Sequence, residues 1–152
     1  MKLAEALVLR ADAQKRFEQL QERIIRNAKV QAGDAPAEDP TGLLSELEQA
    51  AVEMTGLIQK INRTNSVTIF EGNQTLADVL GERDVLLKRC TAYRHLAQMA
   101  SITQNVYSKS EVKFVSTVNV GDVQKRADEL SKAYRELDCR IQELNWKTEL
   151  LN

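Results

Sequence analysis

The sequence predicts an all-α fold, an antiparallel bundle of four long helices with coiled-coil-like seams and two short β segments. The chain holds only 6 glycines and 2 prolines in 152 residues, too few breakers for the many turns of a β-sandwich or barrel. In four stretches, apolar residues recur at alternating three- and four-residue steps, which places them on one face of a helix. Because this length suits one ordinary domain, residues 1–152 are expected to form a single helical-bundle domain.

Two helices are expected in the first half of the chain, over 3–31 and 40–63. The segment 33–40 between them holds both prolines, which cannot continue a helix interior, so it is expected to be a turn or short linker. Asp39 before Pro40 favours a new helix start, because the carboxylate can accept bonds from free N–H groups and proline is tolerated in the first turn. The two apolar stripes comprise Leu3, Ala6, Ala13, Phe17, Leu20 and Ile24, followed by Leu44, Leu47, Ala51, Met54, Ile58 and Ile61.

Two further helices are expected in the second half of the chain. Thr75 with Asp78 three residues later makes a capping box that opens a helix over about 76–105. Asn119 with Asp122 is expected to cap the last helix, which has the most regular heptad pattern of the chain. The two stripes comprise Leu76, Val79, Leu86, Cys90, Tyr93 and Ala97, followed by Val123, Ala127, Leu130, Tyr134, Leu137, Ile141, Leu144 and Leu151.

Two short strands are expected to flank the third helix. Residues 66–70 and 111–120 alternate with period two, and 71–73 is expected to be a turn. A helix of about 30 residues is about 45 Å long, so the two strands start at opposite ends of it. Either the third helix breaks near 98–108 and folds back, or a strand pairs with a second copy of the chain, since a lone strand leaves backbone groups unpaired. The narrow seams also suit association, so a homo-oligomer is expected.

Charge and composition argue against several classes of function. With 21 basic and 22 acidic residues, the net charge of −1 offers no positive excess for nucleic acid or an anionic membrane. Glu5 and Arg10 interrupt the apolar start, and no stretch approaches the roughly 18 apolar residues of a spanning helix. Cys90 and Cys139 lack C-x-x-C spacing and are expected to be free thiols in a reducing compartment. A cytoplasmic protein is therefore expected, with nucleic-acid and membrane binding disfavoured.

The sequence contains no recognisable catalytic or metal-binding motif. A di-iron carboxylate bundle requires Glu-x-x-His pairs from two helices, and His95 is the single histidine. No P-loop, G-x-G-x-x-G, G-x-S-x-G or H-E-x-x-H pattern occurs. We therefore expect no catalytic residue, no metal and no cofactor, and an enzyme would need a site assembled from Arg, Glu, Asn and Tyr side chains.

Two arginines interrupt the apolar stripes at matching positions. Arg10 takes the heptad position of Leu3, and Arg83 takes that of Cys90. In an up-down-up-down bundle each would lie ~10–12 Å from the same end, and because a buried charge is costly unless paired, such a polar layer would be a specificity device or a small-anion site. The alternative is that both side chains extend outward to solvent. The other expected members are Arg140 and Glu143 from the last helix, Glu53 from the second, and Asn62 and Arg63 at the rim.

A separate group of apolar residues is expected at an interface. Trp146, the only tryptophan, lies two residues after Leu144 and points off the seam. It is expected to pack against a neighbouring subunit, or against a loop of its own chain, rather than to bind a ligand. The other interface candidates are the strand residues Val67, Ile69, Val112 and Phe114.

Five segments spread over the chain have the character of family motifs. They are residues 1–12, 33–40, 61–65, 107–111 and 141–151, which read MKLAEALVLRAD, GDAPAEDP, INRTN, YSKSE and IQELNWKTELL. Together they resemble the septicolysin-like family of small uncharacterised bacterial proteins, nearly end to end. The family label implies a membrane-active cytolysin, and the resemblance brings with it no catalytic residue.

The residues themselves favour an oligomeric helical scaffold or binding module. The resemblance implies one alternative, a septicolysin-like membrane-active protein. The arginine-rich layer implies another, a small-anion binder or an enzyme that uses this layer.

Overall fold

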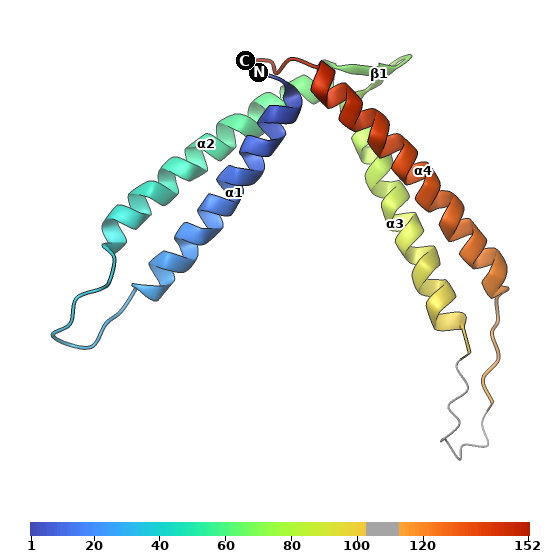
Figure 1. The fold of residues 1–152 in the computed structure, drawn as a ribbon, viewed down its shortest axis with the longest axis horizontal. Helices are drawn as coiled ribbons and strands as arrows, with labels where there is room; N and C mark the ends of the chain where they lie inside the picture. The colour runs from blue at the N-terminus through green and yellow to red at the C-terminus, as the bar shows by residue number, and fades with distance from the viewer. Residues whose placement is uncertain (103–112) are drawn as a thin grey trace. The chain divides into compact units, whose positions relative to one another are not determined.

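The computed structural model describes residues 1–102 and 113–152, and these residues form four helices and one short β-hairpin (Figure 1). The mostly helical fold with a small antiparallel sheet agrees with the fold class that the sequence predicts. The elements are α1 (Leu3–Arg26), α2 (Pro40–Val67), β1 (Ile69–Glu71), β2 (Gln74–Thr75), α3 (Leu76–Ala100) and α4 (Val120–Lys147).

The chain divides into two compact units. The first comprises Met1–Ala77 with Gln142–Asn152, and the second comprises Asp78–Ile141. The first unit therefore contains the α1–α2 hairpin and the β-hairpin, and the second contains most of α3 and α4. The arrangement of all four helices as one coiled-coil-like bundle, and as a single domain over 1–152, stays a prediction.

The start of α2 is the one that the sequence predicts, whereas α1 is shorter. Asp39 caps α2, because its two carboxylate oxygens accept from the N–H groups of Thr41 and Gly42 at 3.1 and 2.9 Å. The predicted end of the first helix at residue 31 is wrong, since α1 ends at Arg26. The amide of Asn27 stops it there: this side chain donates to the carbonyl of Arg23 at 2.9 Å and accepts from the N–H of Glu38 at 3.1 Å.

The core of the first unit lies between α1 and α2, which run side by side (Figure 1). All residues of the predicted α1 stripe are buried or half-buried. The predicted α2 stripe begins one residue too late, because Leu43 and Ala50 are buried whereas Leu44 is 49% exposed. Two adjacent leucines fit the spacing equally well, and only the packing against α1 decides between them. The core cluster consists of Leu20, Leu43 and Ala50, with Phe17, Ile24 and Leu47 packed against it.

The β-hairpin corrects the predicted strand over 66–70. Helix α2 continues to Val67, because the carbonyl of Thr64 accepts from the N–H and hydroxyl groups of Thr68 at 3.0 and 2.7 Å. The strand β1 then pairs antiparallel with β2 of the same chain, so its partner is neither of the two that the sequence suggested, a strand brought back by the third helix or a second copy. The turn between them was expected, and Gly72 has a φ of 55°, a left-handed conformation that glycine adopts without strain.

Helices α3 and α4 form an antiparallel hairpin in the second unit (Figure 1). The predicted stripe of α3 is confirmed, and so is that of α4 except for Leu151, which is exposed beyond the end of the helix. Small buried residues let the helices approach closely, and the thiol of Cys90 donates to the carbonyl of Ala127 at 3.6 Å. The predicted end of the third helix at 105 is wrong, since α3 ends at Ala100.

The connection from α3 to α4 differs from the predicted strand over 111–120. Residues 113–119 form no strand, and 111–112 lie outside the described residues. The cap fixes the start of α4, and the alternating pattern before it forms no strand. Asn119 accepts from the N–H of Asp122 at 3.1 Å, as predicted, and α4 begins at Val120.

Candidate functional site

Arg83 is the predicted site residue that the structure places in the most defined environment. Its side chain is 23% exposed, on the face of α3 that packs against α4. The guanidinium donates to Asp138 of α4 at 3.0 Å and to the neighbouring Asp84 at 3.1 Å. Burial by itself would lower the pKa of Arg83, but the hydrogen bonds to the two carboxylates outweigh it and raise this pKa. Two acids therefore neutralise the charge of this arginine and leave it poorly suited to bind an anion.

The other members of the predicted layer belong partly to the first unit and partly to the second. Arg10 is half-buried on α1 in the first unit, whereas Arg83 belongs to the second, so their common layer stays a prediction. Glu143, another expected member, pairs with Lys147 one turn along α4, whereas Arg83 pairs with Asp138. The Lys147 ammonium lowers the pKa of Glu143. The remaining members, Glu53, Asn62, Arg63 and Arg140, are exposed.

The two ends of the chain meet in a cluster that sequence reasoning missed. Lys2 and the N-terminal amine both pair with Glu149, and their hydrogen bonds lower the pKa of this carboxyl. An isolated β-bridge joins residues 2 and 149, and the N–H of Leu3 donates to the carbonyl of Thr148 at 2.9 Å. Arg63 extends the cluster, since it donates to the carbonyl of Asn152 at 3.0 Å. This cluster ties the end of α4 to α1 and α2.

Two buried polar side chains, those of Thr64 and Asn145, lie in the first unit. Thr64, which is 1% exposed, donates to the carbonyl of Lys60 at 2.8 Å and accepts from the N–H of Leu151 at 3.0 Å. Asn145 is 3% exposed, and its side-chain amide oxygen has no hydrogen-bond partner among the described residues. Both residues lie in segments that the sequence singled out, 61–65 and 141–151, and the structure assigns Thr64 a role in anchoring the C-terminal segment.

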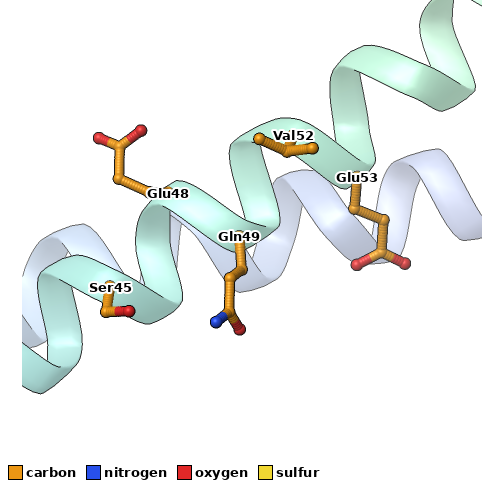
Figure 2. Close-up of a pocket in the computed structure, with 5 residues that line it drawn as sticks. All are labelled: Ser45, Glu48, Gln49, Val52 and Glu53. Carbon is orange, nitrogen blue, oxygen red and sulfur yellow. The ribbon is translucent and has the colours of Figure 1, made fainter.

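The first unit carries a shallow groove along α2. Figure 2 shows that its five lining residues all come from one helix, so no second element forms an opposing wall. Glu53, a predicted layer residue, lies here and is exposed, and the five lining residues include no arginine. A groove of this kind encloses no ligand. The lining residues are Ser45, Glu48, Gln49, Val52 and Glu53.

Several apolar side chains remain exposed. Among the predicted interface residues, Trp146, Val67, Ile69 and Phe114 are exposed, and Val112 lies outside the described residues. Sequence reasoning missed a second apolar stripe on α3, which faces away from α4. It consists of Val85, Ala92, Leu96 and Met99, and we call it the outer stripe of α3.

The described residues show no metal or membrane feature. In residues 1–102 and 113–152, no group of three His, Cys, Asp or Glu side chains is arranged to hold a metal ion. No helix within the same ranges is long and apolar enough to cross a membrane. Cys90 is buried and Cys139 exposed, and both are free thiols as expected.

The fold defines the class of protein: it is mostly helical, with two helical hairpins and one small β-hairpin in the described residues. The chain belongs to a family of unknown function (DUF6847), whose family model matches residues 10–150. It is similar to a solved crystal structure described as a functionally unknown conserved protein from Corynebacterium diphtheriae. The two are 48% identical, with a TM-score of 0.91 and 99% of each chain covered.

These findings correct the resemblance drawn from the sequence. No curated protein matches the chain. The assignment to a septicolysin-like family is wrong, because the matching family and the similar structure are both described only as of unknown function. The five segments quoted for that resemblance are therefore not evidence for a cytolysin.

Proposed function

We propose that the protein is a self-associating helical module of the cytoplasm, an oligomeric scaffold or binding protein rather than an enzyme. One observation supports this most strongly: α3 presents apolar side chains on two opposite sides, and its own hairpin covers only one of them. Apolar patches that stay exposed on a folded unit mark interaction surfaces.

The two sides of α3 differ clearly in burial. On the inner side, Val79 and Cys90 are at most 2% exposed. On the outer side, Val85, Leu96 and Met99 are 56%, 43% and 71% exposed. At 100° per residue the two stripes lie about 140° apart around the helix. Because the α3–α4 hairpin leaves this second apolar stripe exposed, the outer stripe favours a partner.

The charged groups give less support to the alternative of a small-anion binder. An anion site needs positive charge without competing carboxylates, and Arg83 hydrogen-bonds to both Asp84 and Asp138. The two free cysteines agree with a reducing compartment, which is why the proposal places the protein in the cytoplasm.

Light scattering on the purified chain over a range of concentrations tests the proposal. The expected mass is a multiple of 17.1 kDa that declines toward 17.1 kDa on dilution. A mass of 17.1 kDa at all concentrations up to roughly 100 μM would contradict it. Thermal unfolding with added phosphate tests the anion alternative, because a ligand at 100 times its dissociation constant stabilises by about 2.7 kcal/mol. We expect no such shift.

A further inference from the structure

The outer stripe of α3 has the spacing of a coiled-coil seam. Val85, Ala92 and Met99 follow one another at seven-residue intervals, and Leu96 lies beside them on the same side of the helix. The stripe covers about 21 Å of the helix axis. Because the inner side of α3 already packs on α4, this second seam requires a second partner helix.

The apolar area of the stripe suits a dimer of this chain. With Val85, Leu96 and Met99 exposed to 56%, 43% and 71%, and Ala92 exposed as well, each copy presents roughly 350–400 Å² of apolar side chain. Two such stripes bring together roughly 750 Å². Since about 65% of a homodimer interface is apolar, the full interface would be roughly 1,100 Å², which exceeds the ~1,000 Å² expected of a specific contact.

The charges next to the stripe select the direction of pairing. Lys88 lies at its edge, whereas Arg89, seven residues before Leu96, takes the heptad position of that leucine within the stripe. In a parallel pair, each of these cations would face its own copy on the partner helix, and like charges repel. In an antiparallel pair centred on Ala92, they face the Leu96 and His95 region of the partner instead. The antiparallel arrangement therefore avoids the repulsion.

We infer that two copies of the chain associate through the outer stripes of α3, antiparallel and around a two-fold axis at Ala92. This inference rests on the proposed function and specifies its partner. Val85 of each copy then packs against Met99 of the other, so the stripe is complementary to itself as a two-fold interface requires. The small side chain at the centre allows the two helices to approach closely.

Disulfide trapping tests both the face and the direction. The background variant carries Cys139→Ser, which removes the exposed thiol, while Cys90 stays buried. Two cysteines can be joined only when their Cα atoms lie within about 7 Å, so oxidation reports direct contact. Ala92→Cys in this background is expected to shift most of the chain from 17.1 kDa to twice that mass on a non-reducing gel.

Cysteine variants at positions 85 and 99 distinguish antiparallel from parallel pairing. Val85→Cys alone should give only a trace of dimer, whereas Val85→Cys with Met99→Cys should restore it. A strong dimer from Val85→Cys alone would mean parallel pairing and overturn the inferred direction. The control is Lys132→Cys, a substitution at an exposed position of α4, which should stay at 17.1 kDa.

The outcomes also separate this inference from the proposed function. If light scattering shows an oligomer but Ala92→Cys gives no dimer, the chain associates through another surface, and only the inference on α3 is wrong. If the chain is a 17.1 kDa monomer and Ala92→Cys gives no dimer, both are wrong, and the stripe is covered within the same chain or not at all.

Discussion

Replacing Arg83 with methionine tests whether this arginine serves the structure of the α3–α4 hairpin. Methionine keeps an unbranched apolar stem but removes the guanidinium that donates to Asp138 at 3.0 Å and to Asp84 at 3.1 Å. The change leaves the carboxylate of Asp138, which is 32% exposed, without this charge partner. Since the surrounding side chains keep part of the water away, the carboxylate of Asp138 regains only part of its solvation.

The expected loss of unfolding free energy in Arg83→Met lies between two known limits. A hydrogen bond to a charged group contributes about 1.5–3 kcal/mol when it is buried, whereas an exposed ion pair contributes about 0–1 kcal/mol. With side chains that are 23% and 32% exposed, the Arg83–Asp138 pair falls between these limits, so Arg83→Met should cost about 1–2 kcal/mol. The double variant Arg83→Met with Asp138→Leu should recover about 1 kcal/mol, because the stranded carboxylate is removed as well.

Equilibrium urea unfolding measures both values. Far-ultraviolet circular dichroism reports on the helices, and fluorescence of Trp146 provides a second probe whose transition should coincide if unfolding is two-state. Arg126→Met is the matched control, since this arginine pairs with Glu129 on the exposed side of α4 and should cost no more than about 0.5 kcal/mol. A cost below that of the control, or a double variant that recovers nothing, would refute a structural role for Arg83.

Three further predictions concern the core, a carboxylate and a turn. Ile141→Ala removes a fully buried side chain and should cost about 2–5 kcal/mol in urea unfolding, whereas Lys132→Ala should change stability by no more than about 0.5 kcal/mol; equal effects would mean that the assigned register is wrong. Glu38, whose pKa is lowered by the Arg23 guanidinium, should contribute stability above its unfolded pKa of about 4.3 and lose it as the pH falls through its lower folded value. An NMR titration should show the Glu38 pKa rising in Arg23→Met, and an unchanged value would refute the pairing. Gly72→Ala should destabilise the first unit by about 1–2 kcal/mol in thermal unfolding because its φ is 55°, and a neutral effect would contradict that turn geometry.

Local patterns in the sequence sufficed for the helices but not for their ends or for the strands. Asp39 and Asn119 cap the helices that they were expected to cap, because a side-chain cap acts within three residues. The strand partner of β1 escaped notice, since β2 has two residues and cannot show a period. The register of α2 was missed because Leu43 and Leu44 fit the same spacing, and only the contact with α1 distinguishes them.

The candidate site shows the same division between local and distant information. The sequence indicated Arg83 because a charge in an apolar stripe is a local anomaly, but its partner Asp138 lies 55 residues away and could not be chosen over Glu143. The pairing of Lys2 with Glu149 likewise has no local signal. The outer stripe of α3 does have one, its seven-residue repeat, and it was overlooked because the inner stripe already accounted for a helix.

Dimerisation through the outer stripe of α3 is tested by comparing the mass of Met99→Glu with that of the unchanged chain. Met99 is 71% exposed, so a carboxylate at this position should leave the hairpin folded but place a charge in the dimer contact. Val52→Glu, at a 73% exposed position of α2, is the matched control. By light scattering at one concentration, we expect twice 17.1 kDa for the unchanged chain and the control, and 17.1 kDa with unchanged helical content for Met99→Glu. The same mass for all three proteins would contradict dimerisation through this stripe.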